Sequence, residues 1–468
     1  MYAHNNDRLG TDGTIEKLPF WKKLIYALGQ MGWSLASYGA ANLLVYFYLP
    51  PETGGKALFP PMIYQGYVLG VFTIIGLIFA LGRVFDAVTD PLIASWSDRT
   101  KSLFGRRRLF LAVGVLPFAL CSFLVFFPPI KGPSPINSIW VTAMILILYL
   151  FMTIYVTPFF AWLSELGHTS NERLTLSTLI SITWAIGFII GSQSLALQSY
   201  FEHFLEPLKA FQLVMGIFAL VSLFLMALPV IFINERRYCI PHTSSEKVLE
   251  SLKTAFMDKN FLFFTLSDFA YWCALTFIGT GMVYYVTTLL GIEKGFYSLL
   301  MMIMFLLSFV FYVPVTFIAA RTGKKRLLII AFVIFAFTFA YAVILGRVPL
   351  PSRTQGYIVA VLAAIPLAIF GILPNAIIGD IAEAYGNRTG IYKAGIFFGA
   401  RTFMSKMGQM VGALVFPSLL LIGKATGSDL GVRLTAGAAC IFCISGLLLI
   451  LKYDEHAIMR DLAEKKEH

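Results

Sequence analysis

Short polar segments divide the chain into long apolar stretches. Each stretch is long enough to cross a hydrocarbon layer of about 30 Å, which takes about 20 helical residues. Twelve stretches meet this length, at 24–50, 64–96, 109–128, 138–163, 175–198, 208–233, 261–290, 295–319, 325–346, 356–380, 395–422 and 431–451. The pattern predicts an all-α membrane protein with twelve transmembrane helices.

The positive charges between the stretches predict an orientation. Alternate connections, counted with both termini, hold 25 of the 36 Lys and Arg residues, and the opposite connections hold seven. Lys and Arg are enriched in cytoplasmic loops. We therefore expect a multi-pass protein of the plasma membrane, or of the inner membrane in a bacterium, with both termini in the cytoplasm.

The longest internal connection divides the predicted helices into two sets of six. A basic segment after the second stretch, Asp98 to Arg108, is echoed after the eighth by Arg321 to Arg326. Two six-helix bundles related by a repeat are the layout of the major facilitator fold. The predicted parts are a cytoplasmic tail at 1–23, bundles at 24–233 and 261–452, a cytoplasmic linker at 234–260 and a second tail at 453–468.

The amino-acid composition agrees with a lipid environment and excludes several other classes of protein. The chain is 58% hydrophobic and 13% charged, with a mean hydropathy of +0.77, whereas a soluble domain is about a quarter charged. The basic residues that give the net charge of +11 lie between the apolar stretches. They do not form the aromatic-interleaved basic stripes that bind nucleic acid. There is no nucleophile-base, metal-ligand or Walker-type pattern. We predict a protein that is not an enzyme, needs no cofactor and takes its energy from an ion gradient.

The second stretch carries three charged residues, Arg83, Asp86 and Asp90. A charge inside the membrane costs at least about 2.5–3.5 kcal/mol on insertion scales and therefore suggests a function. The i, i+4 spacing places both carboxylates on one helix face. Two such carboxylates need a cation or a proton to offset their charge, which predicts a site for Na⁺ or H⁺. The alternative is an internal Arg83–Asp86 salt bridge, with Asp90 at the cytoplasmic end of the helix.

Lys406 lies in an apolar run of the eleventh stretch, where a lone ammonium needs a partner. We hypothesise that Lys406 neutralises Asp86 and Asp90 until the cation enters. The alternative is a lysine that reaches the cytoplasmic surface. Arg401 lies about 140° away around the same helix and needs a different partner.

Other polar residues fall into two predicted groups. Asp268, beside Tyr271 and Trp272, is placed either in a substrate cavity or at a helix end, with equal weight. Acidic and basic residues at the cytoplasmic ends of helices are expected to form gate salt bridges. These gate residues are Asp98, Arg99, Arg106, Glu165, Arg173, Asp380, Glu383 and Arg388.

A long segment around the acidic pair resembles a known family. The run from Arg83 through Asp86, Asp90 and Pro91 to Arg108 is similar to the glycoside-pentoside-hexuronide:cation symporter family, the melibiose permease-like branch of the major facilitators. The likeness continues over nearly the whole chain, through Thr157-Pro-Phe-Phe-Ala, Gly379-Asp-Ile-Ala-Glu and Gly395-Ile-Phe-Phe-Gly-Ala-Arg.

The resemblance implies roles for particular residues. The cation carboxylates of the family fall on Asp86 and Asp90, its helix-four hydroxyl ligand on Thr153, and its helix-eleven lysine on Lys406. Thr89 stands between the carboxylates where melibiose permease has Asn, and still offers an oxygen. The family's sugar-binding positions, by contrast, carry Ser34, Val156, Phe160 and Ser181. The uncharged candidates left to line a cavity are Ser34, Ser37, Tyr38, Asn42, Gln193 and Tyr271.

These observations lead to one leading hypothesis and two alternatives. We expect a monomeric symporter that couples Na⁺ or H⁺ to a small organic solute, a sugar or glycoside by family resemblance, through alternating access. The first alternative is transport of a lysophospholipid or another amphiphile. The second is a sensor of the same fold that transports nothing.

Overall fold

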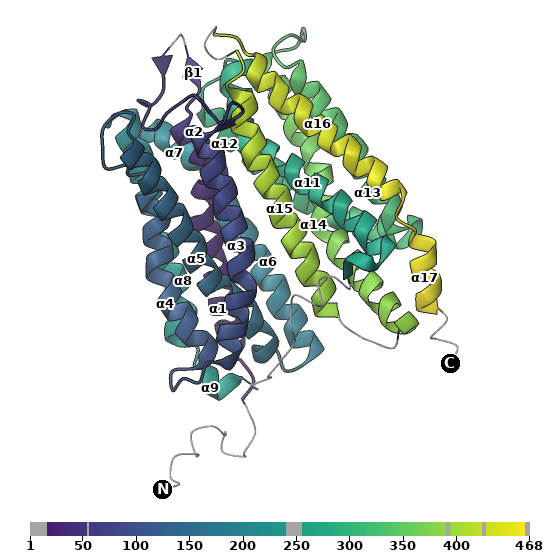
Figure 1. Cartoon of the computed structure of the whole chain (residues 1–468). Helices are drawn as coiled ribbons and strands as arrows, with labels where there is room; N and C mark the ends of the chain where they lie inside the picture. Colours follow the sequence, from purple (N-terminus) through teal and green to yellow (C-terminus); the bar gives the residue numbers. More distant parts are fainter. Residues whose placement is uncertain (1–15, 54–55, 240–254, 390–393, 424–426, 464–468) are drawn as a thin grey trace. The chain divides into compact units, whose positions relative to one another are not determined.

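The computed structural model describes residues 16–53, 56–239, 255–389, 394–423 and 427–463, most of which are helical (Figure 1). The predicted linker and tails lie partly outside these residues. The helices are α1 Phe20–Tyr38, η2 Gly39–Leu43, α2 Leu44–Tyr48, α3 Ile74–Arg99, α4 Arg106–Leu124, α5 Pro135–Leu166, α6 Ser170–Ser192, α7 Ser194–Phe201, α8 Pro207–Phe232, α9 Glu235–Tyr238, α11 Lys259–Tyr284, η3 Tyr285–Leu289, α12 Gly295–Thr322, α13 Lys324–Val343, α14 Ser352–Thr389, α15 Ala394–Leu420, α16 Leu430–Leu451 and α17 Glu455–Ala463. The strands are β1 Glu52–Thr53, β2 Lys56–Ala57, β3 Tyr67–Val68 and β4 Phe72–Thr73.

Nine helices of the described residues are long and apolar enough to cross a membrane. The other three predicted spans lie on α1 with η2 and α2, on α3, and on α15. Charged side chains lower the apolar character of α3 and α15, which carry the acidic pair and Lys406. The all-α fold is therefore the one predicted from the sequence.

The start of the second predicted span was wrong. The span was expected from residue 64, but α3 begins at Ile74. The residues before it form an antiparallel pair of two-residue strands, β3 and β4, around Leu69 and Gly70, whose φ angles are +55° and +75°. This left-handed backbone cannot continue a helix. By contrast, the tenth span remains one helix, α14, through both Pro366 and Pro374.

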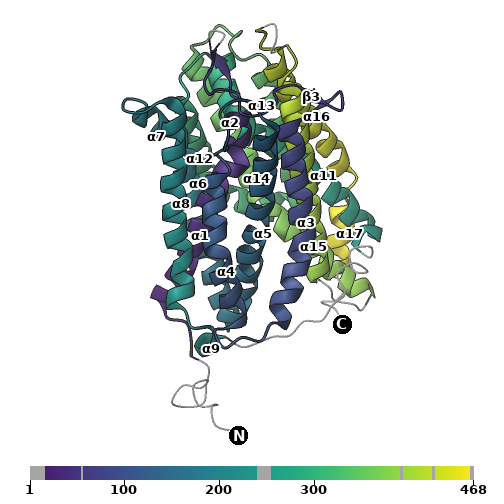
Figure 2. The ribbon, with the colours of Figure 1, turned by 60° about the vertical axis from the view of Figure 1, so that its left-hand side comes forward.

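The described chain forms two compact units. Unit 1 comprises residues 1–47, 62–64 and 85–246, and unit 2 comprises residues 48–61, 65–84 and 247–468. In unit 1, α1 packs between α6 and α8, and α4 packs against α5 and α8 (Figure 2). Glycines allow α1 to approach α6 and α8: a Cβ atom on Gly191 would lie 2.5 Å from the Tyr38 ring, and one on Gly29 would lie 2.7 Å from Cγ of Pro229.

In unit 2, α11 packs against α15 and α16, α13 against α16 and α14, and α12 against α14. The α11–α15 contact depends on Gly408 and Gly412. A Cβ atom on Gly408 would lie 2.6 Å from the carbonyl oxygen of Phe269. Small residues let membrane helices approach closely, so these glycines bring the polar side chains of α11 and α15 together.

Unit 2 includes residues that were predicted to belong to the first bundle, at 48–61 and 65–84. The Tyr284 hydroxyl donates to the carbonyl oxygen of Leu49, and the Tyr67 hydroxyl donates to that of Ser418. These hydrogen bonds join the segment to the end of α11 and to α15. The helix α3 is therefore shared: its first eleven residues, to Val84, belong to unit 2, and the rest to unit 1.

Candidate functional site

Apolar packing holds the acidic part of α3 beside α5. Ile93 of α3, Phe110 of α4 and Ile154 of α5 form one buried cluster. The Trp96 ring lies edge-on to Phe110 at 5.2 Å. Ile154 directly follows Thr153, so this packing sets the distance between the threonine and the two carboxylates.

Five side-chain oxygens converge between α3 and α5. The hydroxyl of Thr153 lies 3.0 Å from Oδ1 of Asp86 and 3.2 Å from Oδ1 of Asp90. Thr89 Oγ1 lies 3.5 Å from the same hydroxyl, and Thr157 donates to Oδ1 of Asp90 at 3.4 Å. The structure thus brings together the four residues predicted as cation ligands, and adds Thr157.

The cluster has more acceptors than protons to share. Thr153 has one hydroxyl proton but two carboxylate oxygens within hydrogen-bond distance. Asp86, Thr153 and Thr89 are buried, whereas Asp90 is partly exposed. Hard oxygen ligands carrying two formal negative charges are the donor set that a small cation prefers. The arrangement suits Na⁺, or a proton bound between the carboxylates.

Two further residues of the predicted cation site lie on separate parts of the fold. Arg83 is on α3, one turn before Asp86, with its guanidinium carbon 5.8 Å from the centre of the Phe79 ring. Lys406 is partly buried on α15, in unit 2. Because the carboxylates belong to unit 1, their pairing with Lys406 stays a prediction.

Several of the predicted gate residues form ion pairs within unit 1. Glu165 at the end of α5 accepts hydrogen bonds from Arg106 at 2.8 Å and from Arg107 at 3.0 Å. Arg107 also pairs with Asp98. The predicted set had Arg106, Glu165 and Asp98 but lacked Arg107, which connects the two acids. Whether this network works as a gate stays a prediction.

Unit 2 has a corresponding network. Asp380 pairs with Lys324 at the start of α13. Arg388 pairs with Asp258 at 2.5 Å and with Asp461 at 3.3 Å, and so joins the end of α14 to the start of α11 and to α17.

The remaining gate candidates make weaker contacts. Arg173 donates to the carbonyl oxygen of Gly167 at 3.3 Å. Arg99 and Glu383 are exposed and take part in none of the ion pairs found among the described residues.

A glutamate binds the first turn of the helix that begins in the basic segment of each unit; Glu235 is buried, and Glu455 is partly exposed. Glu235 accepts the backbone N–H groups of Arg106 and Arg108, at 3.0 and 2.8 Å. Glu455 accepts those of Lys324 and Lys325, at 2.7 and 3.1 Å. Both carboxylates satisfy N–H groups that a helix start leaves without partners. Burial raises the pKa of Glu235, and the donated N–H groups oppose this rise.

The substrate candidates of the first bundle lie mainly inside helix packing. Ser34 and Tyr38 are fully buried where α1 meets α6. Asn42, within the π-helical turn η2, donates to the carbonyl oxygen of Tyr38 at 3.2 Å. Gln193, at the end of α6, donates to the Ser192 hydroxyl at 3.0 Å. Their role in binding a solute stays a prediction.

The candidates of the second bundle surround a buried ion pair. Asp268 of α11 is paired with Arg401 of α15 at 3.0 Å. Tyr271 is buried, with its ring stacked on Phe370 at a centroid distance of 3.8 Å, and Trp272 lies edge-on to Tyr271. Of the two placements considered for Asp268, the helix end is wrong, because Asp268 lies inside α11 and two turns after its start.

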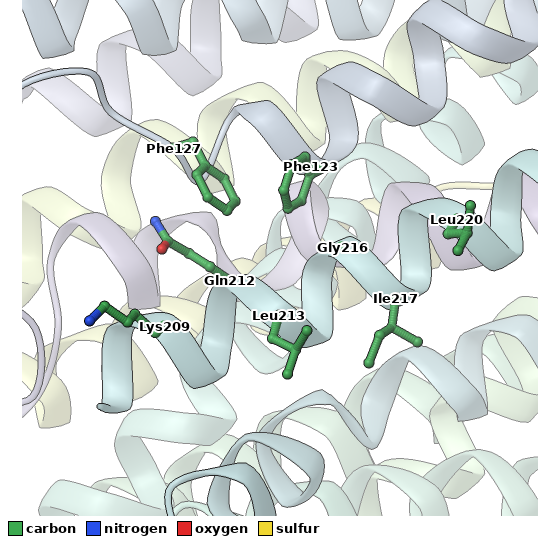
Figure 3. Close-up of a pocket in the computed structure, with 8 residues that line it drawn as sticks. All are labelled: Phe123, Phe127, Lys209, Gln212, Leu213, Gly216, Ile217 and Leu220. Carbon is green, nitrogen blue, oxygen red and sulfur yellow. The ribbon is translucent and has the colours of Figure 1, made fainter. Parts of the chain in front are cut away.

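An apolar groove of about 510 Å³ lies between α4 and α8, away from all predicted site residues (Figure 3). Its walls are mainly Phe and Leu side chains, with Lys209 and Gln212 near one end. The lining residues are Phe123, Phe127, Lys209, Gln212, Leu213, Gly216, Ile217 and Leu220.

Three contacts were missed by sequence reasoning, each for the same reason. Arg107 and Lys324 lie in basic segments and Thr157 lies in an apolar stretch. The partners in these contacts, Glu165, Asp380 and Asp90, are 56 to 67 residues away in the chain. Local spacing does not encode such pairs. For Arg107, the only signal was its place in a run of three arginines.

Comparison with known proteins identifies the family. Residues 25–453 match the family described as MFS/sugar transport protein. The uncharacterized symporter YjmB of Bacillus subtilis is 27% identical over 436 residues, which cover 86% of this chain and 91% of that protein. The isoprimeverose transporter of Lactiplantibacillus pentosus is 22% identical, over 87% of this chain and 81% of that protein.

Other relatives match over shorter stretches. The uncharacterized symporter sll1374 of Synechocystis is 30% identical over 193 residues, or 40% of this chain and 31% of the relative. The inner membrane symporter YicJ of Escherichia coli is 25% identical over 48% of each chain. These two alignments span half or less of the relatives' own length.

Solved structures show the same fold. The nucleoside transporter NupG is 15% identical, with a TM-score of 0.64 over 93% of this chain and all of that one. A bacterial homolog of the human lysosomal transporter Spinster is 14% identical, with a TM-score of 0.59 over 94% and 96% of the two chains. The family match over most of its length, the symporter relatives and this fold together show that the chain belongs to the MFS/sugar transport protein family, among the glycoside-pentoside-hexuronide:cation symporters.

Proposed function

We propose that the chain is a cation-coupled symporter of a small organic solute, with the cation held by Asp86, Asp90, Thr153 and Thr89. One observation carries the proposal: the Thr153 hydroxyl lies within 3.2 Å of an oxygen from each carboxylate. Thr157 supplies a further oxygen from the same helix. Symporter relatives that align over most of the chain support the same function.

The cluster suggests how binding proceeds. Asp90 and Thr157 are partly exposed, while Asp86 and Thr153 are buried. A cation therefore meets Asp90 first and loses its remaining water as it reaches Asp86. Since two neighbouring carboxylates resist being charged together, the bound cation stabilises the buried arrangement of α3 against α5. We infer that this stabilisation links cation binding to solute binding during alternating access, with a sugar or glycoside as the leading solute.

Uptake into vesicles tests the proposal. With an imposed Na⁺ or H⁺ gradient, the wild type should accumulate a sugar above equilibrium, and Asp86→Asn and Asp90→Asn should each abolish this accumulation. Thr142→Val is the matched control, because Thr142 is on α5 and bonds only its own helix, at the carbonyl of Ser138. Solute accumulation that depends on neither the Na⁺ nor the H⁺ gradient would refute symport.

A binding screen distinguishes the two alternatives, a transporter of an amphiphile and a sensor. Ligands that bind the folded state raise its melting temperature. Stabilisation by lysophospholipids with no response to sugars would favour the amphiphile. Binding without uptake of any ligand would favour the sensor.

A further inference from the structure

The groove between α4 and α8 lies within unit 1 and is bordered by two aromatic rings and a glycine (Figure 3). Phe123, in the last turn of α4, and Phe127, just after it, have ring centroids 4.2 Å apart. A Cβ atom on Gly216 of α8 would lie 3.0 Å from Cε2 of Phe123. The missing side chain at Gly216 therefore leaves the space that the two rings border.

The α8 side of the groove is an exposed apolar stripe as long as one leaflet of a bilayer is deep. Leu213, Ile217 and Leu220 are exposed and are spaced by four and three residues, which places them on one helix face. From Lys209 to Leu220 the groove follows α8 for about 16 Å, and half of a hydrocarbon layer is about 15 Å thick. On the orientation predicted from Lys and Arg, this is the outer leaflet.

The polar end of the groove carries one charge of each sign. Lys209 pairs with Glu206 at 3.2 Å, and these side chains are 64% and 74% exposed. An exposed ion pair contributes about 1 kcal/mol or less, so both charges remain available to a third group. Gln212 donates through Nε2 to the carbonyl oxygen of Phe126 at 2.8 Å, which ties α8 to the segment after α4. The Oε1 atom of Gln212 adds an acceptor to this end.

These charges and this shape together match a zwitterionic amphiphile. A phosphate next to Lys209 and an ammonium next to Glu206 would each meet an opposite charge. A headgroup with only negative charge would pair with Lys209 but also face the carboxylate of Glu206. The volume of about 510 Å³ falls within the range of small-molecule sites, and the apolar walls below the charges suit a chain without polar groups.

We propose that this groove binds one zwitterionic phospholipid, with an acyl chain between α4 and α8, the phosphate at Lys209 and the ammonium at Glu206. The lipid is a bound component of the protein and not its solute, so the inference goes beyond the proposed transport and does not depend on it. Lipid tails are as apolar as the side chains that they touch. The headgroup therefore gives the selectivity, and the shape of the groove fixes the position of the chain.

Native mass spectrometry of the full chain, purified in detergent, tests the proposal. The probes are phosphatidylethanolamine and phosphatidylglycerol with identical acyl chains, which differ only in the charge of the headgroup. The wild type should retain one phosphatidylethanolamine and bind it about fivefold more tightly than phosphatidylglycerol, as one favourable charge contact near a membrane surface predicts. Equal binding of the two lipids, or tighter binding of phosphatidylglycerol, would overturn the proposal.

Charge variants locate the headgroup. Lys209→Gln should weaken the binding of phosphatidylethanolamine about fivefold. Glu206→Gln removes the carboxylate and should reverse the preference, so that phosphatidylglycerol binds more tightly. Lys131→Gln is the matched control, because Lys131 is an exposed lysine in the connection between α4 and α5, outside the groove lining, and should bind as the wild type does. An unchanged preference in Glu206→Gln would show that the headgroup lies elsewhere.

Variants that fill the groove locate the acyl chain. Leu213→Trp should weaken the retention of phosphatidylethanolamine about threefold or more, whereas Leu116→Trp, at an exposed position of α4 outside the groove lining, should not. If Leu213→Trp lowers the melting temperature without lipid, Ile217→Trp at the next turn takes its place. Equal retention in the filling variant and its control would overturn the proposal. So would a wild-type dimer that the filling variant dissociates, because a second copy would then occupy the groove.

Discussion

The hydroxyl of Thr153 is in contact with both carboxylates of α3. It lies between Asp86 and Asp90 and can donate to only one of them at a time. A cation removes this shortage, because it accepts electron pairs from all three oxygens together. We therefore propose that the threonine is a neutral ligand of the cation, through its oxygen and not its proton.

Replacing Thr153 tests this role. Thr153→Val keeps the shape but loses the oxygen, and should weaken cation binding about tenfold, the equivalent of about 1.4 kcal/mol. Thr153→Ser should restore most of the affinity. Stabilisation of the purified protein by titrated Na⁺, or by protons, measures the effect. Wild-type affinity in the valine variant would remove Thr153 from the site.

The buried and the half-exposed ion pairs should differ in their value for stability. Glu165 and Arg107 are each about 4–5% exposed, whereas Asp380 and Lys324 are 24–27% exposed. Removing one partner of a buried pair costs about 3–5 kcal/mol, and an exposed pair contributes about 1 kcal/mol or less. Glu165→Gln should therefore lower the melting temperature more than Asp380→Asn. The reverse order, measured by differential scanning fluorimetry, would contradict this assignment.

The sequence predicted which residues belong to the candidate site better than it predicted which residues they contact. The spacing of Asp86 and Asp90 on one helix face is local information, and both stand where expected. Thr153 came from family resemblance, since nothing in its neighbourhood distinguishes it from Thr142 or Thr157. The partner of Arg401 is 133 residues away, and only the tertiary packing of α11 on α15 selects it.

Two helices begin in the same way, after a glycine in the left-handed region. Gly105 before α4 has a φ of +106°, and Gly323 before α13 has a φ of +89°. A Cβ atom would lie 2.5 Å from Glu235 in the first case and 2.8 Å from Glu455 in the second. Each glycine thus provides both the turn and the space for the glutamate that binds the helix start.

Alanine at these glycines should be costly. A positive φ costs a non-glycine residue about 1–2 kcal/mol, and the crowding against Glu235 or Glu455 adds to it. Gly132→Ala is the matched control, because Gly132 has a φ of +91° with nothing within 4 Å of its Cβ position. Gly105→Ala and Gly323→Ala should lower the melting temperature more than Gly132→Ala. Equal losses would mean that the glutamates adapt without cost.

Helix boundaries were the less predictable part of the elements. Hydropathy alone extended the second span to residue 64, because Val68, Leu69 and Val71 are apolar. The left-handed backbone at Leu69 and Gly70 prevents a helix there, so α3 begins only at Ile74. The short polar junction near residue 290 was predicted correctly, since η3 ends at Leu289 and α12 begins at Gly295.

The distribution of Lys and Arg over the whole chain predicts its orientation, which is independent of the fold. Both termini should lie in the cytoplasm. A fluorescent protein fused to the C-terminus should therefore fluoresce, and alkaline phosphatase fused there should be inactive. A fusion after residue 131, in an opposite connection, is the control and should give active phosphatase. Inverted activities would reverse the assignment.

The segment formed by residues 48–61 and 65–84 belongs to unit 2, and this has a consequence for dividing the protein into fragments. A cut in the linker at 240–254 would leave this segment on the first fragment, while its partners Tyr284 and Ser418 stay on the second. The first fragment would then carry a strand pair and half of α3 without the side chains that hold them. Co-expressed fragments should therefore complement one another, whereas each fragment alone would expose unsatisfied backbone and be degraded.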